Sequence, residues 1–321
     1  MHEGIYHVPV MLKEVVGGLN IIPSGIYVDC TYGGGGHSKA ILEKLDNTGK
    51  LIAFDHDADA KANILSDSRL LFVPHNFRHL SRFMRFHKIS KVNGILADLG
   101  ISSHQIDIAE RGFSTRLDAP MDMRMNQNEK LNAAKIISTY TEERLHKIFE
   151  MYGEVTNSKT LAKTIVSLRK SQSLNTIKEF KTALYPIVKG NPEKYFAQVF
   201  QALRIEVNDE LGALKELLGQ VSGALEDGGR VAFITFHSLE DRIVKNFFRY
   251  GNFDEQQIND VYGTPIENDL LIITKKPIIP LPDEIKRNPR SRSSKLRIAE
   301  KKKFQNNQSQ KYSNDGGAKY R

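Results

Sequence analysis

Short apolar runs and helical segments alternate along the first hundred residues of the chain. The apolar runs cover residues 26–30, 51–55, 70–73 and 94–99, and helical patterns lie between them at about 38–45, 58–66 and 78–88. Strands that alternate with helices of this length form βαβ units, in which consecutive strands run parallel. The chain is therefore expected to belong to the α/β class, with a parallel sheet covered by helices.

The pattern changes after about residue 105. Residues 129–186 contain no strand-like run, and their apolar side chains follow helical spacing. This divides the chain into a first part of the sheet domain (residues 1–105), an all-helical insertion (106–205), a second part of the sheet domain (206–285) and a basic C-terminal tail (286–321).

Four further elements are expected in and around the second part of the sheet domain. They are a long helix over about 196–225, a strand over 230–236, a helix over 238–248 and a last strand candidate over 269–274. Pro277, Pro280 and Pro282 are expected to end the folded region. Beyond about residue 304 the Lys, Asn, Gln and Ser bias predicts disorder.

The positive charge of the chain is concentrated in two segments. The whole chain carries a net charge of +8, whereas residues 284–321 alone hold twelve Lys/Arg and three Asp/Glu, a net of +9. Residues 120–205 hold fourteen basic and eight acidic side chains, a net of +6. Such clustering favours a polyanionic partner such as nucleic acid, although a solvated helical face with a disordered tail has the same composition.

Other features limit the compartment and the cofactors. No run approaches 18 apolar residues and the first residues lack a signal-peptide pattern, so a membrane anchor is not expected. The single cysteine, Cys30, cannot form an intrachain disulfide, which fits a reducing, cytoplasmic location. The ten histidines are scattered without zinc-ligand spacing, so no metal is expected.

Four consecutive glycines, residues 33–36, follow the first predicted strand and precede a helix. Backbone N–H groups in such a loop can approach a ligand closely, because no Cβ intervenes. The loop lacks the Gly-Lys-Ser/Thr of a Walker motif and does not fit the dinucleotide spacing Gly-x-Gly-x-x-Gly. A flexible turn is the simple alternative.

Side chains at the next strand ends indicate what this loop binds. Asp55 ends the second strand, Phe77 follows the third and Asp98 ends the fourth. Ligands of open α/β sheets bind at these carboxyl ends. A carboxylate for a ribose, an aromatic ring for a base and no phosphate-binding lysine predict S-adenosylmethionine rather than a dinucleotide. Helix capping by the two acids and a core position for Phe77 are the structural alternatives.

Several longer motifs occur in order along the chain, and they make it similar to a known family. They include residues 7–11 (HVPVM), 33–38 (GGGGHS), 98–103 (DLGISS), 110–114 (ERGFS), 122–125 (DMRM), 200–205 (FQALRI), 236–245 (FHSLEDRIVK) and 290–297 (RSRSSKLR). Over about residues 5–299 the chain resembles the bacterial ribosomal RNA small subunit methyltransferase H family, of the MraW type. The resemblance implies a class I, Rossmann-like methyltransferase sheet with an antiparallel last strand and an inserted helical substrate domain.

The resemblance also implies an activity and a set of site residues. Members of the family use S-adenosylmethionine to methylate N4 of a cytidine in the decoding region of small-subunit ribosomal RNA. The implied cofactor contacts are Gly35, Gly36, His37, Asp55, Phe77, Asp98 and Gln105. Asp98 is also the candidate catalytic residue, as a hydrogen-bond acceptor for the target amine. The expected partner is small-subunit ribosomal RNA or the assembled subunit, and the base must be single-stranded or flipped.

RNA binding is expected from the insertion and the basic tail. The candidates are Arg111, Arg124, Arg204, Arg242, Lys245, Arg290, Arg292 and Arg297. Arg124 and Arg204 have apolar neighbours and could instead be struts between domains. Arg242 and Lys245 could pair with nearby acids, and His237 is expected to be a hydrogen-bonded histidine rather than a base contact.

The tail is expected to be ordered over 286–297. Truncation after Pro289 should weaken RNA binding and leave cofactor affinity unchanged.

Four positions depart from the family pattern: Ala97, His104, Ala119 and Val155. None is an implied cofactor contact. Two other functions stay open: a nicotinamide-dependent oxidoreductase, which the glycine spacing disfavours, and a non-catalytic RNA-binding assembly factor with a vestigial pocket.

Overall fold

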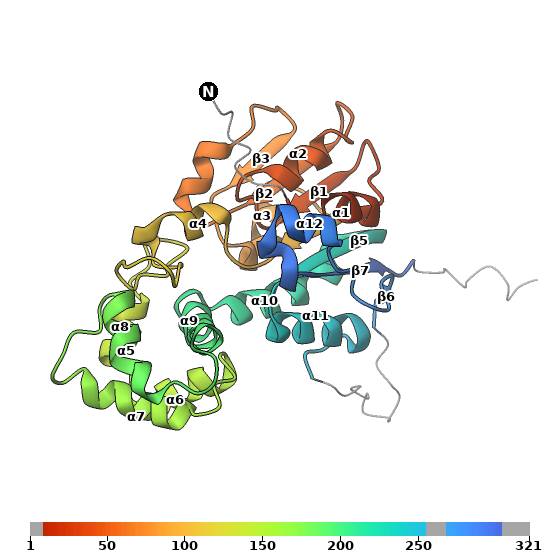
Figure 1. Cartoon of the computed structure of the whole chain (residues 1–321). Helices are drawn as coiled ribbons and strands as arrows, with labels where there is room; N and C mark the ends of the chain where they lie inside the picture. Colours follow the sequence, from red (N-terminus) through yellow and green to blue (C-terminus); the bar gives the residue numbers. More distant parts are fainter. Residues whose placement is uncertain (1–8, 255–267, 304–321) are drawn as a thin grey trace, which may run out of the picture.

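The computed structural model describes residues 9–254 and 268–303. Figure 1 shows a sheet with helices around it and, beside it, a separate group of helices. The predicted disorder after about residue 304, and His7 and Val8 of the first motif, lie outside the described residues. Within the described ranges, no helix is both long and apolar enough to cross a membrane.

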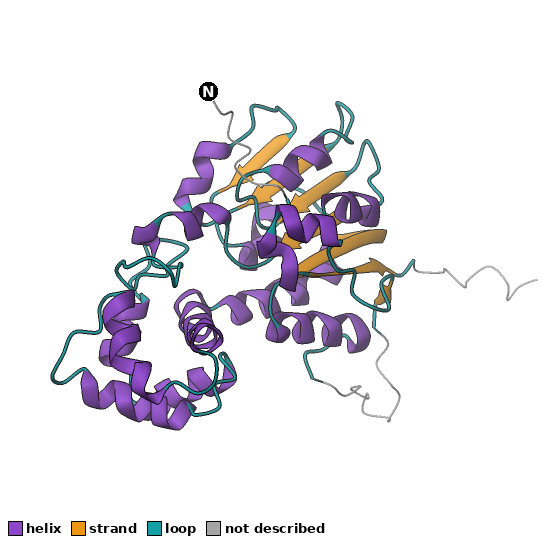
Figure 2. Ribbon diagram, in the orientation of Figure 1, coloured by secondary structure: helices purple, strands orange, loops and turns teal. Residues whose placement is uncertain are grey.

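A seven-stranded sheet forms the centre of the larger body (Figure 2). Its strands are β1 (Ile26–Asp29), β2 (Lys50–Phe54), β3 (Leu70–Val73), β4 (Val92–Asp98), β5 (Leu225–Thr235), β6 (Leu270–Ile272) and β7 (Lys295–Lys301). They lie in the order β3-β2-β1-β4-β5-β7-β6. Strands β1 to β5 run parallel to one another, and β7 is antiparallel to both β5 and β6. The predicted α/β, Rossmann-like class is confirmed.

Helices bury both faces of this sheet. The helices α1 (Leu12–Leu19) and α2 (Gly36–Leu42) pack on one face, and α3 (Leu80–Phe86), α10 (Glu210–Ala224) and α11 (Ser238–Tyr250) pack on the other. Strand side chains alternate between the two layers: Leu96 and Ile234 contact the first layer, whereas Ile95 and Phe233 contact the second. All four are fully buried, so the centre of the sheet is closed to water on both faces.

The helical insertion has a hydrophobic core of its own. Its helices are α5 (Ala133–Thr139), α6 (Glu142–Met151), α7 (Ser158–Leu168), α8 (Ile177–Leu184) and α9 (Pro192–Asn208). Phe149, Phe180 and Phe196 are among its most buried side chains. Thr141, Thr176 and Asn191 cap the N-termini of α6, α8 and α9 by accepting backbone N–H bonds.

Short elements connect these larger units. They are α4 (Ser103–Asp107), α12 (Pro282–Arg287) and the 3-10 turns η1 (Ala58–Asn63), η2 (Phe77–His79), η3 (Ala109–Arg111), η4 (Tyr185–Ile187) and η5 (Pro289–Ser293). The helix predicted over 58–66 is the 3-10 turn η1.

The helix predicted over 196–225 is two helices, α9 and α10. They meet at Asp209, whose φ of 47° is left-handed and breaks the hydrogen-bond ladder. Aspartate tolerates this conformation better than most residues do. Arg78 donates to its carboxylate at 2.6 Å, which holds the break against η2.

The C-terminal segment is part of the sheet, contrary to the predicted tail. The antiparallel strand is β7, between β5 and β6, and its Leu296 and Ile298 are buried. The prolines do not end the fold, because Pro282 occupies the first turn of α12, where its missing N–H costs nothing. Truncation after Pro289 would remove β7, which is paired on both sides in the sheet, so we now expect it to disturb the fold and with it cofactor affinity.

Buried ion pairs hold this basic strand in place. The carboxylate of Asp241, on α11, accepts bonds from Arg297 Nε at 2.6 Å and from Lys295 Nζ at 3.0 Å. Burial opposes ionisation of Asp241, but these hydrogen bonds outweigh it and leave its pKa below the usual value. Two of the cations assigned to a tail therefore share a carboxylate of the folded body.

We predict that Asp241→Ala lowers the free energy of unfolding by about 3 kcal/mol, because it leaves the Arg297 guanidinium buried without a counter-charge. The double variant Asp241→Leu/Arg297→Met, which removes both charges, should recover most of this loss. Urea unfolding followed by circular dichroism measures both. A double variant no more stable than Asp241→Ala would contradict this account of β7.

Candidate cofactor and substrate pocket

A cavity of about 770 Å³ lies at the carboxyl ends of the parallel strands. One wall is built by the glycine loop and by residues that follow β1, β2, β3 and β4. The rest of the lining comes from the α9–α10 junction and from the turn between β5 and α11. The structure thus brings all seven predicted cofactor contacts to one cavity.

The glycine loop needs glycine at two of the implied positions. Gly35 has a φ of 75°, and a Cβ there would lie 2.7 Å from the Tyr32 hydroxyl. A Cβ on Gly36 would lie 2.8 Å from Cγ of Pro9. Side chains at these positions would therefore clash with the loop's own surroundings, and the backbone stays bare toward the cavity.

Asp55 is held at the end of β2 by two backbone N–H groups. Gly33 N donates to Oδ2 and Asp57 N donates to Oδ1, each at 2.8 Å. Burial raises the pKa of this carboxyl to about 6, against the lowering effect of those two bonds. Each oxygen keeps a second lone pair that could accept a bond from a ribose hydroxyl.

Asp98 closes the same wall at the end of β4. Its backbone N–H donates to Thr31 Oγ1 at 2.7 Å, which ties the end of β4 to the turn after β1. Its Oδ2 lies 3.6 Å from His37 Nδ1, and its Oδ1 is buried without a hydrogen-bond partner. Burial, with the nearby charges of Asp29 and Glu240, raises the pKa of Asp98 well above its usual value.

Phe77 and Gln105 both line the pocket, but they differ in whether their side chains remain free to contact a ligand. Phe77 begins η2 after β3 and is only partly buried. Gln105 is 5% exposed and already bonded at both ends of its amide, donating to Asp57 Oδ2 at 2.7 Å and accepting from Ser102 N at 3.0 Å. Gln105 therefore supports the wall through α4.

The other part of the lining contains an ion pair, Arg204–Glu210, and a buried carboxylate, Glu240. Arg204, near the end of α9, binds both carboxylate oxygens of Glu210, at 2.8 and 2.9 Å. Glu240, 2% exposed, accepts a bond from Phe236 N at 2.8 Å. Burial opposes its ionisation, but His237, Arg204 and that N–H outweigh the effect and lower its pKa. Glu240 is thus a buried carboxylate whose charge acts on Asp98.

His237 is hydrogen-bonded, as expected, through one ring nitrogen. Its Nδ1 accepts from Glu240 N at 3.4 Å and caps α11, so Nε2 carries the proton. Nε2 lies 3.3 Å from a Glu240 oxygen, a charge contact, but it makes no aligned hydrogen bond. The signal in the sequence was its position directly after a strand next to β4, where side chains reach the ligand edge.

One group in the described part of the chain has the residue types of a metal site. Glu210, His237 and Glu240 place possible ligand atoms within 4.8 Å of one another. Arg204 already binds both oxygens of Glu210, so a cation there would compete with a guanidinium.

Three predicted RNA contacts are buried instead. Arg111 is 3% exposed and bonds to Asp57 and Asp59, Arg204 holds Glu210, and Arg297 holds Asp241. A guanidinium that is already bound to carboxylates is poorly placed to contact a phosphate, so the structure argues against an RNA contact by these three arginines. For Arg204 the alternative of a strut is the better description.

The other five candidates are at least partly accessible. Arg124 is pinned to Asp122 and to two loop carbonyls, and Lys245 is half-buried. Arg242 reaches Glu154 of the insertion at 3.5 Å, and Arg290 reaches Asp107 of α4 at 2.6 Å. Arg290, which lines the pocket, and Arg292 are exposed.

The four departures from the family pattern have structural explanations. Ala97 is fully buried in β4, and Ala119 and Val155 belong to the core of the insertion. His104 Nε2 lies 3.3 Å from Asp59, which Arg111 also binds. The histidine therefore joins the ion-pair cluster that supports α4.

Comparison with known proteins agrees with this architecture. The model of the MraW methylase family matches residues 4–302. The chain belongs to the MraW methylase family. Its relatives include the ribosomal RNA small subunit methyltransferase H of Bacteroides thetaiotaomicron, 52% identical over 94% of this chain and 99% of the relative. The protein of that name from Cytophaga hutchinsonii is 52% identical over 92% of this chain and 100% of its own.

Among solved structures, NSun6 from Pyrococcus horikoshii covers 93% of this chain and 53% of its own, at a TM-score of 0.40 and 14% identity. The MraW match confirms the predicted family and shows that the protein is a methylase. S-adenosylmethionine is the methyl donor of the MraW family, and the bare glycine loop and unpartnered Asp98 oxygen fit such a group.

We predict that cofactor affinity rises with pH through about 6. Below that value Asp55 is protonated and loses the ionised oxygens that accept hydroxyl bonds, so the dissociation constant at pH 5 should be about tenfold higher than at pH 7. Asp55→Ala should weaken binding at least tenfold at pH 7, through the loss of charge-assisted bonds worth about 1.5–3 kcal/mol.

Titration calorimetry with S-adenosylmethionine measures both effects. Asp55→Asn is the matched control, because it keeps the side-chain size and removes the titrating group, so its affinity should change little between pH 5 and 7. An unchanged pH profile in Asp55→Asn would assign the dependence to another group.

Proposed function

We propose that this protein transfers a methyl group from S-adenosylmethionine to N4 of a cytidine in the decoding region of small-subunit ribosomal RNA. The names of relatives that are about half identical over nearly the whole chain support the RNA class. The polar atoms of the pocket support the choice of cytosine as the base and of N4 as the methylated atom.

The observation that carries the proposal is a pair of buried polar atoms that make no aligned hydrogen bond and belong to two residues lining one pocket. Asp98 Oδ1 is an acceptor, and His237 Nε2 is a donor. A flipped cytosine presents an amino donor at N4 beside a ring acceptor at N3, and flipped bases are read at this edge. Uracil presents the reverse order, an acceptor at O4 and a donor at N3. It would place an acceptor against Asp98 Oδ1 and a donor against His237 Nε2. Adenine shares the order of cytosine, so nucleoside analysis of the methylated RNA has to distinguish those two.

The cofactor would be held on the wall of the glycine loop. The backbone of Gly35 and Gly36 would face it, Asp55 would accept from its ribose hydroxyls and Phe77 would contact its base. When bound, S-adenosylmethionine supplies a methyl group on a positively charged sulfur. The carboxyl groups of Asp55 and Asp98, which line the pocket, would favour a cation when ionised, since buried charges interact strongly.

Asp98 would orient the amine and accept its proton. The N4 lone pair is delocalised into the ring, and an acceptor on an N–H group favours the more tetrahedral nitrogen that reacts. As nitrogen bonds to the methyl carbon its N–H becomes acidic, and that proton can pass to Asp98 Oδ1. Its raised pKa would make the ionised Asp98 a stronger base than an ordinary aspartate, and the positive charge of bound S-adenosylmethionine would favour that ionised form.

The decisive experiment is methyl transfer to small subunits from cells that lack the enzyme. With tritiated S-adenosylmethionine, the wild-type protein should label the RNA, and nucleoside analysis should find the label in N4-methylcytidine. Label in N6-methyladenosine would overturn the base assignment. Normal cofactor binding with no transfer to subunits or naked RNA would favour the non-catalytic assembly factor.

Asp98→Asn should lower single-turnover methyl transfer more than it lowers cofactor affinity, because the amide keeps the shape of the carboxylate and loses its basicity. We expect a drop in rate of at least a hundredfold, within the range for loss of a general base. Equal losses of rate and affinity would mean that Asp98 acts only through the cofactor.

The variant His237→Asn is compared with Asp98→Asn, because it changes the other polar group proposed to contact the base. Asparagine is a good N-cap, so α11 and the melting temperature should be preserved. The variant should raise KM for RNA and leave cofactor affinity unchanged.

A further inference from the structure

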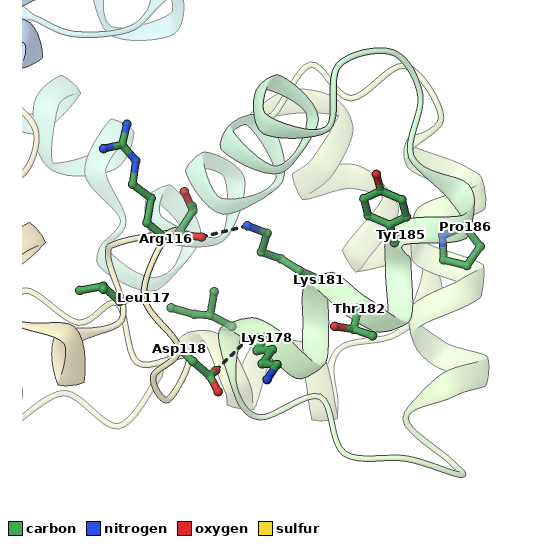
Figure 3. A pocket seen from close by; sticks show the side chains of 10 residues that line it. Arg116, Leu117, Asp118, Lys178, Lys181, Thr182, Tyr185 and Pro186 are labelled. Atoms are coloured by element: carbon green, nitrogen blue, oxygen red, sulfur yellow. Dashed lines mark hydrogen bonds between the residues drawn. The ribbon is translucent and has the colours of Figure 1, made fainter.

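A second hollow lies on the helical insertion, outside the cofactor pocket (Figure 3). It is an open groove of about 590 Å³ between the loop of residues 115–118 and the helix α8 with the turn η4. Its volume is within the range of small-ligand pockets, and its open shape suits a segment of chain better than an enclosed molecule. None of the predicted RNA contacts lies in it.

Two cations in this groove have no ion-pair partner among the described residues. Arg116 and Lys178 are both exposed. The one acid of the groove, Asp118, accepts the backbone N–H of Lys178 at 3.0 Å, so it helps to begin α8. Elsewhere in the insertion, Arg144 pairs with Glu206 and Arg204 with Glu210. The groove thus concentrates positive charge that the fold does not use.

A third cation fixes the shape of the groove. Lys181 Nζ donates to the carbonyl of Thr115 at 2.9 Å, the contact marked in Figure 3, and lies 5.4 Å from the ring centre of Phe196. It ties the loop to α8 and adds its charge to the floor. The two walls are therefore held in place before any ligand binds.

An exposed aromatic ring stands at the other end of α8. Tyr185 is 61% exposed and sits in η4, directly before Pro186, whose ring restricts the backbone. Seven residues separate it from Lys178, which at 1.5 Å per helical residue is about 10 Å. The groove therefore has free cations at one end and a rigid aromatic ring at the other. Proteins bind single-stranded nucleic acid through this combination.

The groove is also connected to the cofactor pocket by a short segment of chain. Arg111 is anchored to Asp57, a residue of the pocket wall, and Thr115 follows four residues later. Four residues span at most about 14 Å. An RNA strand with one base in the pocket could therefore reach the groove with the nucleotides next to that base.

We propose that this groove is a second RNA site, which binds single-stranded nucleotides flanking the target. Arg116 and Lys178 contact phosphates, and Tyr185 stacks on a base. The proposal rests on the proposed function, because it assigns a further part of the same RNA substrate.

The test measures binding of a labelled single-stranded RNA of about twelve nucleotides to the full chain over a range of salt concentrations. Arg116→Ala/Lys178→Ala should weaken binding at low salt about tenfold or more and reduce the salt slope by about 1.4, or 0.7 for each phosphate that the protein no longer neutralises. Lys163→Ala/Lys170→Ala is the matched control: it removes two exposed charges from α7 and the turn after it, away from the groove.

Tyrosine variants test the stacking separately. Tyr185→Leu should weaken binding about fivefold to tenfold without changing the salt slope, because stacking releases no counterions. Tyr185→Phe, which keeps the ring, should bind like wild type. Thermal unfolding and cofactor affinity should be unchanged in all four variants.

The outcomes separate this proposal from the proposed function. If the groove and control double variants behave alike, or if Tyr185→Leu binds normally, the groove proposal is wrong even when the wild-type protein methylates subunits. If groove variants weaken RNA binding while the wild-type protein transfers no methyl group, the groove stands and the proposed reaction fails. Weakened binding to assembled subunits but not to RNA would identify a protein partner and overturn the proposal.

Discussion

Parallel pairing of β1 with both β2 and β4 is the constraint on which the pocket depends. It brings the ends of three strands to one edge, so Asp29, Asp55 and Asp98 converge although nearly seventy residues separate the first from the last. Their burial raises the pKa of each carboxyl. A cavity with such groups favours a positively charged ligand, which is the character of a sulfonium methyl donor.

Buried arginines join the remaining units to this edge. Arg111 binds Asp57 and the carbonyls of Arg124 and Met125, and thereby fixes the start of the insertion against the pocket. Arg297 binds Asp241 and fixes β7 against α11. Because a buried charge without a partner is costly, each pair specifies one arrangement of the segments that it joins.

The two parts of the pocket lining differ in their chemistry. The wall of the glycine loop has bare backbone and carboxyl groups of raised pKa, whereas the other part has Glu240 held ionised beside His237 and Arg204. Asp98 Oδ1 and His237 Nε2, which make no aligned hydrogen bond, belong to these two parts of the lining. The insertion contributes to the same pocket through Arg204, near the end of α9.

The sequence by itself determined the α/β class, the glycine loop and the strand-end acids, because periodicity and strand-end chemistry are local. It also placed an all-helical segment over 129–186. Only the tertiary structure identified β7, since a strand with cations at 295, 297 and 301 reads as a solvated tail until Asp241 and the carbonyl of Leu225 are seen to receive them. The same reason hid the roles of Arg111, Arg204 and His237: charge and spacing are local, whereas burial and pairing depend on which distant segments meet.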